Sequence, residues 1–154
     1  MTLLLAFLIG FFAGLRSLTP PAATAWAASL GWLKLEPPLS FMGSTPAVVI
    51  FTLLAAMELV ADKLAIMPSR KSPPGLIARI LSGGLTGACV AASGGQGILP
   101  GAVLGAVGGV AGCFAGYSAR VGIVKALGTK DIYVALIEDF TAVAGSLWVV
   151  SRSL

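Results

Sequence analysis

A run of 40 residues without any Asp, Glu, Lys or Arg, from residue 80 to residue 119, constrains this chain more than any other feature of its sequence. Over all 154 residues, 57% of the side chains are hydrophobic and only 10% are charged. Soluble domains carry about 25% charged residues, because their surfaces must interact with water. The chain is therefore expected to be an integral membrane protein built from apolar helices.

The same composition excludes several classes of function. The net charge of +4 is spread along the chain, which gives no support to nucleic-acid binding and leaves membrane lipids as the expected partner. The chain has no histidine, and its two cysteines, Cys89 and Cys113, lie far apart in apolar stretches. We therefore expect no metal site, no cofactor and no enzyme activity, and we expect both thiols to be buried.

A membrane-spanning helix needs about 20 apolar residues, so the length allows about five spans in one all-α membrane domain. The hydrophobic pattern predicts these spans at about residues 2–30, 46–66, 76–92, 98–119 and 132–150. Loops 67–75 and 120–131 carry five basic side chains, and the positive-inside rule places such loops in the cytoplasm. A chain with five spans then has its amino terminus inside and its carboxy terminus outside.

The first segment, residues 2–30, does not fit a simple span. As one helix it would be about 43 Å long, whereas the hydrocarbon core of a bilayer is about 30 Å thick. Arg16 and Thr19-Pro20-Pro21 lie at its centre, and two prolines remove two backbone donors. The sequence predicts a break at 16–21 between two half-helices, 2–16 and 22–30. If the segment instead forms a re-entrant hairpin, the amino terminus changes side.

Five charged residues lie on apolar segments where bare hydrocarbon is expected: Arg16, Glu58, Asp62, Glu138 and Asp139. A charge at the centre of a bilayer costs about 2.5 kcal/mol or more unless it is paired, neutralised or hydrated. Glu58 and Asp62 are four residues apart, so a helix projects both toward a shared neighbour, for which Arg16 is the natural candidate. The substrate-binding residues expected from this pattern are Arg16, Ser17, Thr19, Glu58, Asp62, Lys63, Arg79, Glu138 and Asp139. In the alternative interpretation the charges form a structural ion-pair core, in which Arg16, Lys63, Arg79 and Arg120 balance the four carboxylates.

Glycines recur at every fourth position of segment 98–119 and form two stripes along the predicted helix. Such stripes let another helix approach closely inside a membrane. They predict either a seam between two copies of the chain or close packing within one copy. The helix-packing glycines are Gly101, Gly105, Gly108, Gly109, Gly112 and Gly116.

The chain also contains a short internal similarity. Residues 10–14, Gly-Phe-Phe-Ala-Gly, resemble residues 112–116, Gly-Cys-Phe-Ala-Gly, and an arginine follows each, at Arg16 and Arg120. In a five-span chain three spans separate the starts of these two helices, so the halves would form an inverted repeat of the kind many transporters have. Chance similarity between stretches of low complexity is the alternative.

Three elements of the sequence together resemble one bacterial membrane family. They are Gly14-Leu15-Arg16-Ser17-Leu18-Thr19-Pro20-Pro21-Ala22, then Glu58-Leu59-Val60-Ala61-Asp62-Lys63-Leu64 running to Pro68-Ser69-Arg70, and Arg79 with the glycine-rich segment. On these elements the chain resembles, over nearly its whole length, the family catalogued as domain of unknown function 4126. The resemblance implies a single membrane domain and brings no established substrate or reaction.

Two functions are compatible with these features. The first is a small homodimeric secondary transporter or permease of the bacterial inner membrane, with a charged cavity that faces the cytoplasm. A small anionic substrate would suit Arg16, an amphiphilic one would suit the sparse polar lining, and the carboxylates would bind a coupling ion or proton. The second is a membrane scaffold or lipid-binding protein with a structural ion-pair core. A membrane enzyme acting on lipid has no recognised motif in this sequence.

Overall fold

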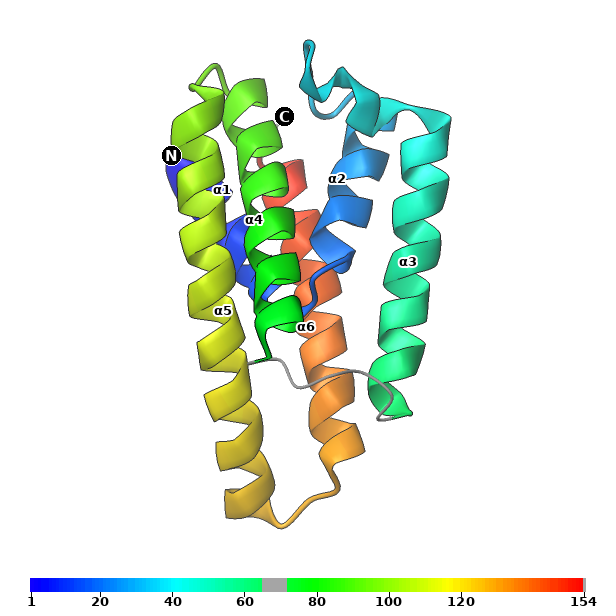
Figure 1. Ribbon diagram of the computed structural model, residues 1–154, viewed down its shortest axis with the longest axis vertical. Helices are drawn as coiled ribbons and strands as arrows, with labels where there is room; N and C mark the ends of the chain where they lie inside the picture. Colours follow the sequence, from blue (N-terminus) through cyan, green and yellow to red (C-terminus); the bar gives the residue numbers. More distant parts are fainter. Residues whose placement is uncertain (65–71, 154) are drawn as a thin grey trace.

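The computed structural model describes residues 1–64 and 72–153. All regular elements within these ranges are helical, which confirms the predicted fold class. Figure 1 shows the helices arranged as an elongated bundle. They are α1 (Thr2–Leu15), α2 (Thr19–Ser29), the 3-10 helix η1 (Leu39–Gly43), α3 (Thr45–Lys63), α4 (Pro73–Ser93), α5 (Ile98–Leu127) and α6 (Asp131–Ser151).

Four of the described helices, α3 to α6, are long and apolar enough to cross a membrane. Many large hydrophobic side chains on these helices are exposed, such as Leu53 on α3, Leu81 on α4 and Phe140 on α6. A soluble protein would bury such side chains, whereas a membrane protein presents them to lipid. The chain is thus a bundle of membrane-spanning helices.

The first segment forms a hairpin, and the expectation that residues 2–30 make one broken span is wrong. α1 and α2 have 14 and 11 residues, so neither reaches more than about 21 Å, which is shorter than a bilayer core. α1 descends to the middle of the bundle and α2 returns to the end from which α1 started (Figure 1). Leu5, near the start of α1, and Ala27, near the end of α2, accordingly belong to one buried cluster.

The bundle therefore has two distinct ends. The one we call the terminal end holds both chain termini, since a single cavity there is lined by Met1, Trp32, Ser93 and Arg152. The opposite end, which we call the basic end, holds the end of α3, the start of α4 and the turn 128–130 between α5 and α6 (Figure 1). The amino terminus and the basic loops thus lie at opposite ends of the bundle, as in the re-entrant alternative and not as in the five-span arrangement.

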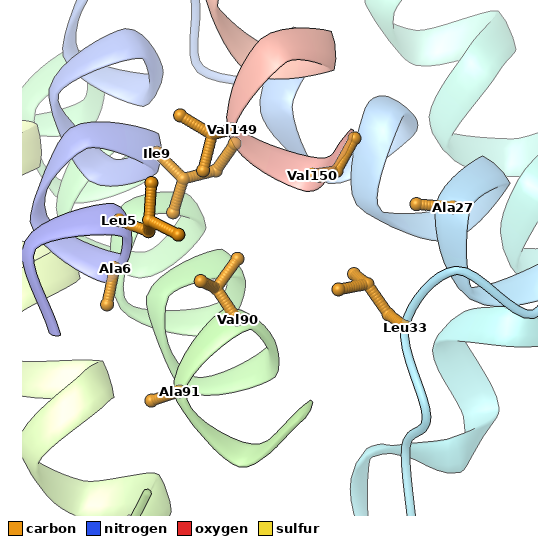
Figure 2. Packing of buried hydrophobic residues seen from close by; sticks show 9 residues of the cluster. All are labelled: Leu5, Ala6, Ile9, Ala27, Leu33, Val90, Ala91, Val149 and Val150. Carbon is orange, nitrogen blue, oxygen red and sulfur yellow. The ribbon is translucent and has the colours of Figure 1, made fainter. Parts of the chain in front are cut away.

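Figure 2 shows how the hairpin is anchored at the terminal end. Leu5, Ile9, Val90 and Val149 bring α1, α4 and α6 together in a buried cluster, to which Ala27 of α2 and Leu33 also belong. Burial of these apolar side chains removes them from water or lipid and fills the space between the helices. The cluster fixes both arms of the hairpin, and hence the position of its tip.

The break in the first segment lies at residues 16–18, not at 16–21. Arg16 has an extended backbone, and α2 begins at Thr19, so Pro20 and Pro21 occupy its first turn. Proline suits that position because the first amides of a helix have no intrahelical partner. The two prolines thus start the second helix instead of separating the two.

The glycine stripes of α5 face two neighbouring helices of the same chain. A Cβ at Gly101 or Gly105 would overlap the backbone of α4 at Gly87 or Gly83, and one at Gly112 would overlap the backbone of α1. α1, α4 and α5 therefore pack with their backbones in contact, as small residues allow in membrane bundles. Gly108 faces α1 and Gly109 faces α4, and Gly116 is buried.

The remaining element boundaries differ from expectation mainly at the basic end. α5 continues to Leu127, so the first eight residues of the predicted loop 120–131 are helical. α4 begins at Pro73, inside the predicted loop 67–75, whose residues 67–71 lie outside the described part of the chain. The predicted end of the second span at residue 66 also lies outside it, and α3 ends at Lys63.

The predicted inverted repeat is wrong. α1 and α5 run in the same direction, because Gly10 faces Gly105 while Gly14 faces Gly109 and Cys113. Only α3 and α4 cross between the starts of these two helices, and two crossings restore the original direction. The similar segments 10–14 and 112–116 are parallel.

Candidate functional site

Residues from four helices meet at one depth, beside the tip of the hairpin. Measured along each helix from the terminal end at 1.5 Å per residue, Arg16, Glu58, Arg79 and Asp139 all lie about 20 Å deep. All four residues are buried. Buried charges in a membrane protein must be paired, and their partners define the site.

Arg16 lies directly after the last residue of α1, and its side chain is 1% exposed. Its Nε donates to Asp139 Oδ1 at 2.6 Å, and its Nη2 lies 2.9 Å from Asp62 Oδ2. Arg16 thus joins two spanning helices, α3 and α6, through two carboxylates. The prediction that Arg16 is the shared partner of the carboxylates on α3 holds for Asp62, whereas Glu58 has different contacts.

Glu58 binds the backbone of the hairpin tip. Its Oε1 accepts hydrogen bonds from the amide and the hydroxyl of Ser17, at 2.9 and 2.7 Å, and its Oε2 accepts one from the amide of Leu18, at 2.9 Å. These donors lead directly into α2, where the helix dipole favours a negative charge. The Glu58 carboxylate, which belongs to α3, therefore caps the amino-terminal end of α2.

Arg79 binds the other arm of the hairpin, at the end of α1. Its Nε donates to the carbonyl oxygen of Gly14 at 2.9 Å, and its Nη1 donates to that of Gly75 at 2.8 Å. Carbonyls in the last turn of a helix lack intrahelical donors, and a cation is favoured there. An anion at the start of α2 and a cation at the end of α1 thus stabilise a break that hydrocarbon alone would not tolerate.

A chain of ion pairs connects Arg16 to the basic end. Lys63 Nζ lies 2.8 Å from Asp139 Oδ2, and Arg120 Nη1 lies 3.3 Å from Asp62 Oδ2 and 3.7 Å from Glu138 Oε2. Arg120 also donates from Nε to Asp131 Oδ1 at 2.7 Å. The side chains become more exposed along this chain, from 11% at Asp139 and 16% at Asp62 to 61% at Asp131. The network therefore leads from the buried tip toward the surface at the basic end.

A small cavity of about 190 Å³ lies beside this network, between α5 and α6. Its lining is mostly apolar, with Leu15, Ile123 and Ile137, and it also includes Arg120 and Glu138. Apolar walls with a few convergent polar groups are typical of sites for small molecules. The cavity thus adjoins the outer part of the ion-pair chain.

The structure brings together most of the residues that the sequence singled out. Arg16, Asp62, Lys63, Glu138 and Asp139 share the ion-pair chain, and Ser17 and Glu58 bind each other beside it. Arg79 contacts the hairpin through Gly14, and Thr19 is buried at the start of α2. Among the described residues, no cluster of Asp, Glu or Cys is arranged to hold a metal ion.

The sequence-based site omitted three participants. Arg120 and Asp131 were expected in a loop. Leu18 contributes its backbone amide, which no pattern of side chains in the sequence reveals. Arg120 lies at the end of a charge-free run in a stretch without proline after Pro100, and this is the signal that could have placed it on α5. The amide of Leu18 could be found only from the fold.

Neither the curated proteins nor the solved structures include a match to this chain. One family matches over residues 3–152, which includes the hairpin, all four spanning helices and every residue of the charged network. The chain belongs to this family, whose description is domain of unknown function (DUF4126).

Proposed function

We propose that the chain is a small secondary transporter or permease, which moves a small anionic or amphiphilic molecule across the membrane. The observation that carries the proposal is the position of Arg16, buried at the tip of a re-entrant hairpin and bound to Asp62 and Asp139 on two different spanning helices. Ionisable groups inside a membrane are costly and mark transport pathways. Discontinuous helices likewise mark the substrate sites of secondary transporters.

The ion-pair chain supplies the means of coupling in this proposal. Asp62 lies between Arg16 and Arg120, and Asp139 lies between Arg16 and Lys63. Each aspartate can therefore exchange one cationic partner for another, or for a proton or ion, while the buried charge stays compensated. The basic end faces the cytoplasm in this proposal, because its loops carry the basic excess, and both termini then face outward.

In this proposal the protein is located in the bacterial inner membrane and forms a homodimer. A dimer seam would use a surface other than the glycines of α5, since α1 and α4 already fill those positions. The exposed apolar face of α3, with Ile50, Leu53 and Met57, is available for such a contact. Membrane lipids are the other expected partners.

The experiment is a flux assay on proteoliposomes with a panel of radiolabelled small carboxylates, phosphate and amphiphilic anions. We expect the wild-type protein to accelerate uptake of at least one of them, and we expect Asp139→Asn to abolish that uptake. Glu36→Gln is the matched control, because Glu36 is the one acidic residue outside the charged network. Equal uptake by wild type and Asp139→Asn would contradict the proposal.

The second candidate function is a membrane scaffold or lipid-binding protein with a structural ion-pair core. It is favoured by one observation: within the described residues, each charge at the hairpin tip already has a protein partner. In that case no member of the panel should be transported by wild type or by any variant, whereas Asp139→Asn should reduce stability under either function. The two functions therefore predict different results in the same assay.

A further inference from the structure

The hairpin tip holds Glu58 in the manner in which helix ends hold bound anions. Two adjacent amides and one hydroxyl, from Ser17 and Leu18, converge on its two carboxylate oxygens at 2.7 to 2.9 Å. Such convergent donors at the start of a helix bind phosphates and carboxylates from ligands in many proteins. Here the anion is a side chain of another helix, and it is buried.

The composition of the tip limits the size of this site. Pro20 and Pro21 have no N–H, so the first turn of α2 offers few amides beyond those that already bind Glu58. The hydroxyl of Thr19 is a further donor in this turn. Thr19 is 6% exposed, and its Oγ1 has no hydrogen-bond partner within residues 1–64 and 72–153. Because buried hydroxyls are almost always hydrogen-bonded, this one indicates a polar partner beyond the residues that the structure describes.

The helix that carries Glu58 is the least buried of the four spanning helices. Only 22% of its apolar window is buried, compared with 33% to 50% in α4, α5 and α6. It packs mainly on α2, where Trp26 Nε1 donates to Thr52 Oγ1 at 3.0 Å. An outward movement of α3 would remove Glu58 from the amides and Asp62 from Arg16 together, because both carboxylates lie on one face of this helix.

We infer that the hairpin tip is a binding site for a carboxylate group of the substrate, and that Glu58 occupies this site when no substrate is bound. The inference rests on the proposed transport function, which it deepens by naming the substrate class. The amides of Ser17 and Leu18 and the hydroxyls of Ser17 and Thr19 are the donors. A substrate carboxylate replaces the Glu58 carboxylate, so the negative charge at the start of α2 is conserved during the exchange.

The test uses acetate as the probe and the purified full chain in detergent. Glu58→Ala removes the internal carboxylate and leaves the donors of the tip vacant. We expect acetate to raise the Tm of this variant saturably, by about 3 °C or more, since a ligand that binds only the folded state stabilises it. Sodium chloride at the same ionic strength is the control for a general salt effect.

Two further variants make this result specific. Wild type should respond to acetate much more weakly than Glu58→Ala, because acetate has to displace Glu58. Glu36→Ala, which removes a carboxylate outside the network, should respond no more than wild type. When Glu58→Ala is combined with Ser17→Ala, at least tenfold more acetate should be needed for half of the maximal increase in Tm. Only two of the three donors that bind Glu58 remain in this double variant. An acetate response in Glu58→Ala that is no larger than the chloride response, or an equal response in Glu36→Ala, would overturn the inference.

The outcome remains decisive if Glu58→Ala is unstable. Recovery of monodisperse protein in acetate but not in chloride supports the carboxylate site, and aggregation in both salts counts against it. The flux assay fails or succeeds independently. Acetate stabilisation without flux would mean a carboxylate site without transport, whereas flux without acetate stabilisation would mean transport of a substrate held elsewhere.

Discussion

Arg16 and Asp139 are 123 residues apart in the sequence, and their side chains form a buried hydrogen bond of 2.6 Å beside the tip of the hairpin. The contact links the end of α1 to the middle of α6. It also sets the depth at which the chain turns back, because the arginine at the turn has to reach a carboxylate on a helix that crosses the membrane. Four predictions follow from this arrangement and from the packing that supports it.

Asp139 and Asp131 form a matched pair for testing burial, since both lie on α6 and both contact an arginine. Asp139→Asn should lower the free energy of unfolding by about 3 kcal/mol, because it leaves the buried Arg16 undercompensated and removes the partner of Lys63. Asp131→Asn should lower it by less than about 1 kcal/mol, because its side chain is 61% exposed. Thermal and chemical unfolding in detergent measures both, and similar losses would refute the importance of burial.

The ion pair should contribute more to transport than to folding. The double substitution Arg16→Met and Asp139→Leu removes both charges of the pair, so neither is left buried without its partner. Apolar replacements of buried ion pairs are often tolerated. We expect the double variant to be more stable than the sum of the two single effects predicts, and to transport nothing. A double variant that retains wild-type flux would show that the pair has no role in transport.

Close packing of α5 predicts opposite results for two of its glycines. Gly105→Ala should destabilise the protein by about 1 to 3 kcal/mol or more, because the new Cβ would overlap the carbonyl oxygen of Gly83, which is backbone. Gly122→Ala should be neutral or stabilising by up to about 1 kcal/mol, since nothing lies within 4 Å of the added atom and alanine favours helix. Unfolding curves compare the variants directly, and equal destabilisation would argue against backbone contact between α4 and α5.

The hairpin predicts which positions are accessible from the same side of the membrane. Single cysteines at Thr2→Cys and Gln96→Cys should react with a membrane-impermeant maleimide from one side, and Thr129→Cys should react only from the other. The native thiols of Cys89 and Cys113 are buried and should stay unlabelled in the folded protein. Labelling of Thr2→Cys and Thr129→Cys from the same side would mean that residues 2–30 cross the membrane once.

The sequence predicted the elements of the site better than their connections. Glu58 and Asp62 share a helical face at a spacing of four residues, and the structure places both beside the hairpin tip. Arg16 was expected to bind both, yet Glu58 binds amides instead. Hydropathy and spacing describe side chains, whereas the donors for Glu58 are largely backbone groups that become available only where a helix starts.

Membrane location and the helical class were determined by the sequence itself, because a run of 40 uncharged residues can be accommodated only where water is absent and backbone polar groups pair within helices. The break near Arg16 was equally visible. Whether that break separates two halves of one span or turns the chain back was decided by the tertiary structure. Both paths satisfy the same backbone hydrogen bonds, and the choice depends on the anchoring of Leu5 and Ala27 in one cluster and on the reach of Arg16 to Asp62 and Asp139.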